Sequence, residues 1–324
     1  MITLEQAKEL SQDKLTNDVI DEFRQSPLLD SLPFDNTVKV QGGKSLTYSF
    51  NRVTTLPTAG ARLINGEYTA QEAATTRQHV DLKVMGGSYE IDRVIAEDET
   101  QVVDAVEFQS KQKAKATVAE FHNQCINGDS NTNAGEFDGI DKAVSGTTTD
   151  VSANSIDLST ADSIKTNAHA FLYLMRQLRK GMDGKPTHYL MNNDMYAVFQ
   201  SIADVSNNVR YTKDELGKEV LVYDGGVLVD MGDKPGTSTP IIPTSDPTTA
   251  KFGETAIYAV RVGMDGVHGV SPAGAKIVKT YLPDFKTAGA VKKGEVEFVG
   301  AIAVKSTRSV GKLSGIGVTP KKST

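Results

Sequence analysis

The sequence predicts an α+β fold that carries an extended arm, and two observations lead to this prediction. The first is the order of the segments, in which a helix, strands, further helices and then mostly strands follow one another. The second is a pair of alternating apolar and polar segments, beginning at Ser45 and at His79, with a long polar connection between them. Because a hairpin with so long a connection has no core of its own, we expect it to project from the body and to find its stability on a neighbour.

Composition excludes several classes of function. The chain has 324 residues, with 35 Lys plus Arg against 41 Asp plus Glu and a formal charge of −6. No basic run is longer than two residues, so a nucleic-acid-binding face is disfavoured. The chain has no Trp and an aromatic content of 6%, so few rings are available to stack on bases or sugars. Binding of single-stranded nucleic acid or of carbohydrate is therefore also disfavoured. A single cysteine, Cys125, excludes an internal disulfide and a Cys-rich zinc site.

The location predicted from the sequence is the inside of a cell. No segment approaches the ~18 consecutive apolar residues that a membrane span needs. The N-terminal sequence MITLEQAKEL lacks the basic start and apolar run of a signal peptide. We therefore expect a soluble protein without a membrane partner.

The chain ahead of the hairpin begins with a helical pattern. Thr3-Leu-Glu-Gln6 has the spacing of a capping box, and apolar residues follow at helical intervals as far as Phe23. Pro27 and Pro33 then break the chain. We expect residues 1–44 to form an N-terminal arm that packs on a distant part of this subunit or on another subunit.

The hairpin is predicted from residue 45 to residue 86. Its first strand alternates at Leu46, Tyr48 and Phe50, and its second strand begins at His79. Gly86-Gly87 is expected to end the hairpin.

The strongest helical segment runs from Asp98 to about Asn127. Acidic residues cluster at its start, where the helix dipole favours them, and an apolar stripe follows, formed by Val102, Val106, Val118, Phe121 and Cys125. At ~1.5 Å per residue this helix would be roughly 40 Å long. We expect it to cross a whole domain as a spine.

The second half of the chain alternates helices and strands. A polar stretch from Ser145 to Ser159 precedes a helix expected from Thr160 to Lys180, with Ile164, Ala168, Phe171, Leu172, Met175 and Leu178 on one side. The remaining predicted elements are a strand at 188–191, a helix capped near Asn192 that runs to Ile202, two valine-rich strands around the turn 224–226, and strands near 256–262, 275–280 and 296–304.

One loop resembles a metal site at first sight. Asp129, Asn131 and Asn133 match the first three ligands of a calcium loop, but Ala134 and Ile140 occupy positions where that loop needs Gly and Glu. We therefore expect a helix stop, with a left-handed turn at Asn127-Gly128 and Asp and Asn side chains capping the local backbone.

Other candidate motifs also fail their spacing tests. Gly42-Gly-Lys-Ser45 lacks the leading glycine of a phosphate loop and is followed by a strand pattern. Ser271 lacks the last glycine of a nucleophile elbow, and Gly263 to Gly269 has the wrong spacing for a dinucleotide fingerprint. The five histidines stand singly, at positions 79, 122, 169, 188 and 268. The sequence predicts no catalytic residue, no metal ligand and no cofactor, and hence no enzyme.

The order of several short motifs resembles the major capsid proteins of tailed bacteriophages of the Hong Kong 97 type. The motifs are YEIDRV at 89–94, FHNQCINGD at 121–129, FDGI at 137–140, HYLMNN at 188–193, PIIPT at 240–244 and GETAIY at 253–258. Each motif is weak alone, but together they cover most of the chain from about residue 45 in the family's order. The resemblance implies a Hong Kong 97-like fold with an N-terminal arm, an extended hairpin arm or E-loop, a spine helix in a peripheral domain, and an axial domain.

The resemblance also implies a domain division and a function. The units would be the N-terminal arm 1–44, the hairpin arm 45–86, the peripheral domain 87–144, the axial domain 145–251, and return strands with a C-terminal tail 252–324. Copies would assemble into pentamers and hexamers of an icosahedral head that encloses double-stranded DNA without binding it specifically. Contacts between subunits are expected at Leu56, Arg62, Glu67, Tyr68 and Arg77.

Further expectations concern partners and place. The short N-terminal segment implies a separate scaffolding protein and little N-terminal processing, and a portal and a decoration protein are further candidate partners. Residues 56–78 contain no lysine, so a covalent crosslink from this arm is not expected. The protein would reside in the virion, and in the host cytoplasm during assembly. The shell of an encapsulin-type nanocompartment shares the fold and is the alternative, and an enzyme of unknown type is a third reading.

Overall fold

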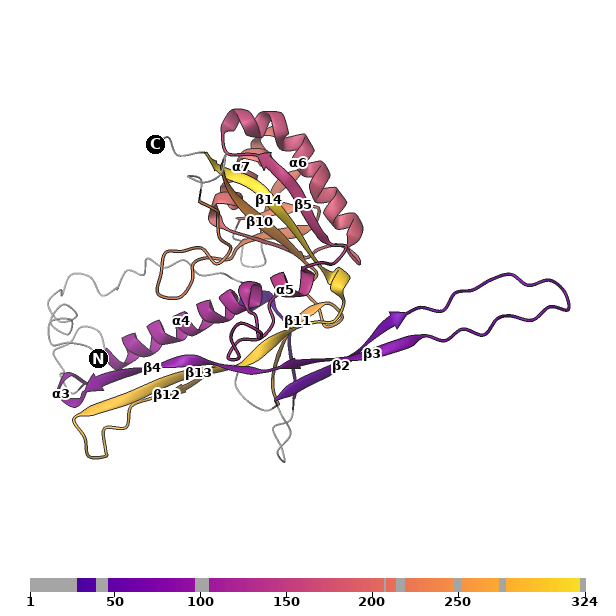
Figure 1. The fold of residues 1–324 in the computed structure, drawn as a ribbon. Coiled ribbons are helices and arrows are strands. Elements are labelled where there is room, and N and C mark those ends of the chain that lie inside the picture. Colours follow the sequence, from indigo (N-terminus) through magenta and orange to yellow (C-terminus); the bar gives the residue numbers. More distant parts are fainter. Residues whose placement is uncertain are drawn as a thin grey trace.

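The fold was described from a computed structural model of the chain (Figure 1). The structure describes residues 28–38, 46–96, 105–206, 208–213, 219–246, 252–273 and 278–320. The predicted N-terminal helix, the first turns of the predicted spine helix and the Gly42 to Ser45 motif lie outside these residues. Within them, no helix is both long enough and apolar enough to cross a membrane.

Three parts are visible in Figure 1: a seven-stranded body, an elongated spine layer beside it, and a hairpin arm that extends away from both. The strands of the seven-stranded body follow the order β5-β14-β10-β6-β9-β8-β7. Their bounds are Asp150–Asp157 (β5), His188–Met191 (β6), Val209–Lys213 (β7), Glu219–Tyr223 (β8), Gly226–Asp230 (β9), Phe252–Val260 (β10) and Val310–Pro320 (β14).

Two helices cover one face of the seven-stranded sheet, α6 (Ala161–Gly181) and α7 (Asn193–Val205). Thr160 and Asn192 cap them, because each side chain accepts a hydrogen bond from a backbone N–H in the first turn. All six apolar residues predicted for the first helix are buried in the core under it. The two helices, the cap at Asn192 and β6 are confirmed as predicted.

Both faces of the central strands of this sheet are buried, and alternation along these strands explains how. Tyr189 and Met191 point into the core beneath α6 and α7, whereas Leu190 between them points into the core shared with the spine layer. Ile257 and Tyr258 divide in the same way on β10. Because successive residues of a strand face opposite sides, β6 and β10 contribute to both cores and so connect the seven-stranded body to the spine layer.

The spine layer consists of a five-stranded sheet with α4 (Ala105–Asn127) lying along it (Figure 1). Its strands are β1 (Phe34–Val38), β4 (Lys83–Asp92), β11 (Val267–Pro272), β12 (Val278–Tyr281) and β13 (Val291–Val304). The centre of contact is Phe121 of α4 against Phe298 of β13, with ring centroids 4.8 Å apart. Short helices complete the described chain: α2 (Leu28–Ser31), α3 (Arg93–Ala96), α5 (Ile140–Val144) and the 3-10 turn η1 (Thr307–Ser309).

The predicted stripe of the spine helix is confirmed only in part. Phe121 and Cys125 are fully buried, but Val118 is half-buried, and Thr117 occupies the buried position beside it. Thr117 can be buried because its hydroxyl donates to the Lys113 carbonyl oxygen at 2.9 Å.

Gly86-Gly87 does not end the hairpin, and the prediction that it would is wrong. Both glycines lie inside β4, which pairs with β13 over its whole length. A Cβ atom at Gly86 would lie 2.1 Å from the Val296 carbonyl oxygen, so the close approach of the two strands requires a glycine there. The hairpin ends instead at Asp81, and Leu82 turns the chain into β4.

The helix stop after Asn127 is confirmed, but its mechanism differs from the prediction. Neither Asn127 nor Gly128 has a positive φ. A Cβ atom at Gly128 would lie 2.2 Å from the Phe137 carbonyl oxygen, since the returning chain passes directly over this position. The Gly139 N–H donates to the Gly128 carbonyl oxygen at 2.8 Å and closes the loop.

Five strands escape prediction from the sequence: β1, β5, β7, β11 and β14. The last of them lies inside the seven-stranded sheet, parallel to β5 and antiparallel to β10. That sheet therefore combines residues from both sides of the predicted boundary at residue 251, and the division into five units stays a prediction.

Candidate assembly surfaces

The hairpin arm, residues 47–81, extends away from the rest of the described subunit (Figure 1). β2 (Thr47–Thr55) pairs with β3 (Ala74–Asp81) in register from Thr47 opposite Asp81 to Thr55 opposite Ala74. Beyond β2 and β3 the two connecting segments of the polypeptide continue side by side to a distant tip (Figure 1). Every residue from 53 to 77 is exposed.

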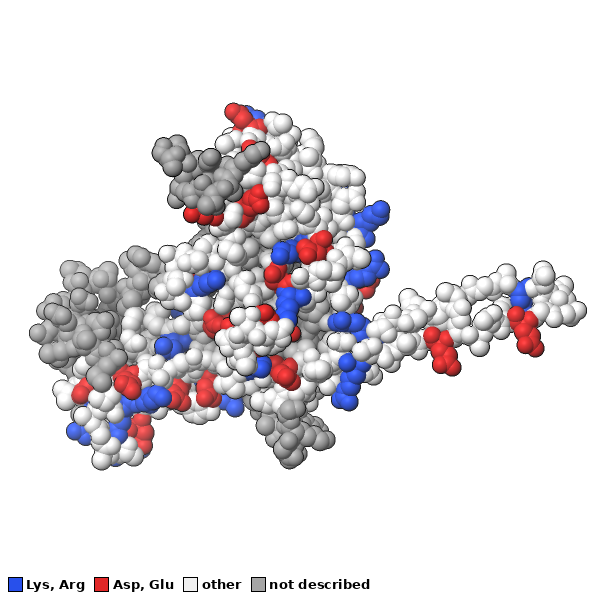
Figure 2. Space-filling model, in the orientation of Figure 1, with Lys and Arg blue, Asp and Glu red and all other residues white. Residues whose placement is uncertain are grey.

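Figure 2 shows the arm as a mostly uncharged projection. Its exposed part carries two basic and two acidic side chains, Arg62, Arg77, Glu67 and Glu72. Since these charges balance, the arm is not suited to follow a polyanion.

The tip of the arm has a defined shape. Asn65 adopts a left-handed conformation with φ of 69°, and the Gly66 N–H donates to the Leu63 carbonyl oxygen at 3.0 Å. The Arg62 guanidinium donates to the Gly66 carbonyl oxygen at 3.1 Å and stacks 5.4 Å from the centre of the Tyr68 ring. These contacts hold the turn so that the neighbouring apolar side chains face outward.

The arm exposes large apolar side chains to water, which is unfavourable for an isolated subunit. Ile64 is 91% exposed, Leu63 84% and Leu56 77%. Large apolar side chains exposed to this extent are typical of a surface that contacts another molecule. Of the five predicted contact residues, Leu56, Arg62, Glu67, Tyr68 and Arg77, all are exposed on the arm, and their contact with another subunit stays a prediction.

Leu63 and Ile64 are absent from the predicted contact set although they are the most exposed apolar residues of the tip. The signal that could have found them is Asn65-Gly66, because this dipeptide is typical of a tight turn and places the residues before it at the apex.

The root of the arm is fixed to the spine layer. The Arg52 guanidinium donates to the Val304 carbonyl oxygen at 2.7 Å and to the Lys305 carbonyl oxygen at 2.9 Å. Tyr48 is buried against β11 and β13, and its hydroxyl donates to Asp35 at 3.0 Å. Burial alone would raise the pKa of the Asp35 carboxyl, but hydrogen bonds from Thr37 and Tyr48 lower it overall. The arm therefore has a rigid base and a free end.

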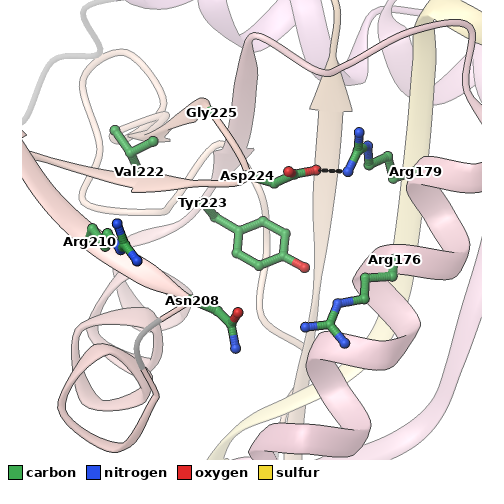
Figure 3. A pocket seen from close by; sticks show the side chains of 8 residues that line it. All are labelled: Arg176, Arg179, Asn208, Arg210, Val222, Tyr223, Asp224 and Gly225. Atoms are coloured by element: carbon green, nitrogen blue, oxygen red, sulfur yellow. Dashed lines mark ion pairs between the residues drawn. The ribbon is translucent and has the colours of Figure 1, made fainter.

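A basic pocket lies at one end of the seven-stranded body (Figure 3). Its volume is about 430 Å³, and its lining includes Arg176, Arg179, Arg210, Asn208, Tyr223 and Asp224. The three arginines are separated in the sequence by up to 34 positions, so no local motif indicates them.

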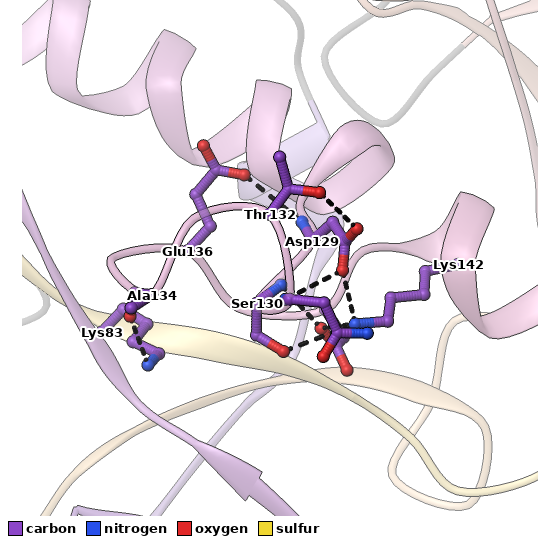
Figure 4. A network of polar contacts seen from close by, with 9 residues as sticks. Lys83, Asp129, Ser130, Thr132, Ala134, Glu136 and Lys142 are labelled. Carbon is purple, nitrogen blue, oxygen red and sulfur yellow. Dashed lines mark hydrogen bonds and ion pairs between the residues drawn. The ribbon is translucent and has the colours of Figure 1, made fainter.

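The loop after the spine helix is held by a network of polar contacts (Figure 4). Lys142 Nζ lies 2.5 Å from the Asp129 carboxylate and 2.7 Å from that of Asp138. Asp129 also accepts hydrogen bonds from the Thr132 hydroxyl and the Asn131 N–H. The hydrogen bond from Lys142 is the main cause that lowers the pKa of Asp129 to about 2.

This network gives the residues of the calcium-like motif a structural role. The Asp129 oxygens are already bonded to Lys142, Thr132 and the local backbone. Lys83 of β4 donates to the Ala134 carbonyl oxygen at 2.8 Å and joins the loop to the spine layer. In the described ranges no three His, Cys, Asp or Glu side chains gather as metal ligands would.

Two polar residues considered for catalysis are buried in strand β11. Ser271 donates its hydroxyl hydrogen to the Asn36 side-chain oxygen, which lies on the neighbouring strand β1. His268 is fully buried and stacks edge-on against Tyr48, with ring centroids 5.7 Å apart. Burial lowers the pKa of His268. Neither side chain is open to a substrate in the subunit.

Comparison with known proteins was made at the level of sequence and of structure. No family model and no curated sequence matches this chain. Solved structures do match it over nearly its whole length. The encapsulin of the holo-SrpI complex from Synechococcus elongatus PCC 7942 has a TM-score of 0.66 at 14% identity, and covers 100% of this chain and 99% of its own.

Viral and virus-like particles match over a similar range. The capsid of an empty GTA particle has a TM-score of 0.60 at 10% identity, and a chain of Mycobacterium phage Bobi has a TM-score of 0.59 at 12% identity. Both cover 97% of this chain and 98% of their own. This chain has the Hong Kong 97-type fold. The predicted fold class is thereby confirmed, and in the Hong Kong 97-type fold the hairpin arm described above corresponds to the predicted E-loop.

Proposed function

We propose that this protein is a structural shell protein, the major capsid protein of a tailed bacteriophage. The observation that carries the proposal is the arm: residues 53–77 leave the body fully exposed, while their apolar side chains gather at a shaped tip. Such an arm is stable only when a surface outside its own subunit covers it. Neighbours of the same fold include a capsid and phage chains, which supports a shell as that setting.

The proposed mechanism is assembly through many modest contacts. Copies would form pentamers and hexamers, and each arm would lie across an adjacent copy through Leu56, Leu63, Ile64 and Tyr68. Once one contact has formed, the others form at a high effective concentration, so a closed shell needs no single strong interface. The net charge of −6 favours a wall that encloses double-stranded DNA without adhering to it.

A nanocompartment shell is the second candidate. It is favoured by the TM-score of 0.66 with an encapsulin, which covers the whole of this chain. The two functions differ in the content of the particle, which is DNA in one case and a protein cargo in the other.

The first experiment is electron microscopy of the purified full-length protein, expressed alone and with the candidate scaffolding protein. Closed isometric particles, or rings of five and six, are expected. Particles purified from the native source would then be treated with nuclease and analysed for protected DNA. Protected DNA supports the capsid, and a co-purifying protein cargo without DNA supports the nanocompartment.

A shortened arm provides the matched control. Residues 56–73 are replaced by a two-residue Asn-Gly turn, which suits a tight hairpin between Thr55 and Ala74. We expect a folded subunit, with the circular dichroism spectrum of the full-length protein, that forms no closed particles. Closed shells from this variant would contradict the role of the arm, and small monodisperse particles from the full-length protein under both conditions would contradict assembly altogether.

A further inference from the structure

The basic pocket of Figure 3 is built from three separate elements of the seven-stranded body. Arg176 and Arg179 lie one turn apart on α6, so both side chains project from the same face of the helix. Arg210 comes from β7, Tyr223 is the last residue of β8, and Asp224 lies in the turn that follows. The pocket therefore depends on the packing of α6 against the far end of the sheet.

The turn between β8 and β9 places a carboxylate, that of Asp224, at the pocket, and among the described lining residues it is the sole one. Asp224 and Gly225 both have positive φ, 49° and 88°, as in the tight turn that fits two antiparallel strands. In this position the Asp224 carboxylate forms an ion pair with Arg179. Arg179 is thereby held at the rim, with its side chain 38% exposed.

Arg176 has no such acidic partner. No carboxylate of the described chain forms an ion pair with it. Tyr223, which also lines the pocket, supplies no negative charge at neutral pH, because burial raises the pKa of its hydroxyl. In Figure 3 the Arg176 side chain extends from α6 toward Tyr223 and Asn208, and Arg210 lies on the opposite side of Tyr223 in this view, among the residues that line the pocket. Arg176 therefore brings to the pocket a positive charge that no carboxylate of the described residues pairs with.

We propose that this pocket binds a phosphate group, as free phosphate or as the phosphate of a small ester such as a mononucleotide. Guanidinium groups are the side chains best suited to bind phosphate, because each offers two parallel N–H donors. Asn208 and Tyr223 add neutral donors on the same wall. The proposal is independent of whether the chain assembles into a shell.

Geometry favours phosphate over a carboxylate. A carboxylate is planar and can be saturated by one arginine through two parallel N–H donors. A phosphate presents oxygens in several directions and can accept from arginines on different elements at once. The volume of about 430 Å³ exceeds that of a phosphate ion and lies in the range of small-ligand sites, which leaves room for the rest of an ester.

The test is isothermal titration of the full-length protein at constant ionic strength, once with inorganic phosphate and once with AMP. We expect a dissociation constant of about 1 mM or tighter for at least one of them. Equal affinities identify free phosphate as sufficient, and tighter binding of AMP identifies an ester. No heat from either titrant overturns the proposal.

Three variants sharpen the test. Arg176→Ala is expected to weaken binding about tenfold or more, because it removes a charged donor pair. Lys165→Ala is the matched control, since it removes a positive charge from the exposed side of the same helix and outside the pocket, and its affinity should equal that of the unmodified protein.

Asp224→Asn should change the affinity in the opposite direction. Asn tolerates the positive φ of this turn, keeps the shape of the side chain and removes the carboxylate that competes for Arg179. We expect binding to tighten severalfold. Equal weakening in Arg176→Ala and Lys165→Ala would show a non-specific charge effect and overturn the proposal, as would an unchanged affinity in both Arg176→Ala and Asp224→Asn.

Discussion

The seven-stranded body and the hairpin arm use apolar residues in opposite ways. In the body, Phe171 of α6 and Phe199 of α7 pack in a buried core, with their ring centroids 5.4 Å apart. In the arm, Leu63 and Ile64 are almost fully exposed, although leucine and isoleucine are among the residues most often buried in a folded protein. The body therefore gains its stability within one chain, whereas the arm has no such core, and in the proposed shell a second copy would cover it. Four predictions test this comparison, in order of the expected change in the free energy of unfolding.

Phe121→Ala in the spine helix should have the largest effect. The ring is fully buried between Phe298 and Phe137, and its removal leaves a cavity that costs about 3–5 kcal/mol. Urea unfolding of the unassembled subunit measures this cost. Val118→Ala, at the half-buried position one turn before, is the matched control and should cost clearly less; equal costs would show that the stripe is uniformly buried.

Lowering the pH should destabilise the subunit through His122. Burial lowers the pKa of this side chain to about 4 in the folded state, against about 6.5 when unfolded. Below pH 6.5 the unfolded chain takes up a proton that the folded chain does not, so this contribution to stability is complete above that pH and is lost as the pH falls to about 4. The loss amounts to about 3 kcal/mol.

A variant isolates this effect from other titrating groups. The difference in unfolding free energy between the unmodified protein and His122→Gln should shrink by that amount between pH 7 and pH 4. A difference that stays constant over this range would contradict the burial of a neutral imidazole.

Arg52→Ala tests the root of the arm. The variant loses two charged hydrogen bonds to backbone carbonyl oxygens of residues 304 and 305, and a cost of about 1–2 kcal/mol is expected because the site is half-buried. Arg77→Ala removes the same charge from the exposed neighbouring strand, where a change within about 0.5 kcal/mol is expected. Chemical denaturation of both variants would show whether the root is anchored; a larger cost for Arg77 would reverse this assignment.

Ile64→Asp at the tip should have the smallest effect on folding and a large effect on assembly. The side chain is 91% exposed, so the unfolding free energy should change by no more than about 0.5 kcal/mol. In the proposed shell this position is covered by another copy, and burying an unpaired carboxylate there is unfavourable. Electron microscopy should show few or no closed particles, and normal particle yield would remove the tip from the interface.

The main part of the fold was predictable where a segment's pattern depends on its own neighbours. The two capped helices α6 and α7, the strand β6, the turn after β8 and the existence of an arm all follow from periods of 3.6 and 2 and from capping residues. The glycine-rich strand β14 carries no such pattern. In the sequence, Gly317 argues against a strand, because a glycine inside a strand usually weakens it. In the structure, a Cβ atom at this position would lie 2.4 Å from the Phe252 ring, so the close packing requires a glycine.

The candidate sites divide in the same way. The sequence by itself determined that an arm exists and that the charges of its exposed part balance, because these properties depend on composition and local alternation. Only the tertiary structure decided that Gly86 belongs inside β4, that β14 completes the seven-stranded sheet and that Arg176 and Arg210 face one pocket. Each of these results from contacts between segments far apart in the chain, and such contacts leave no periodic trace in either segment alone.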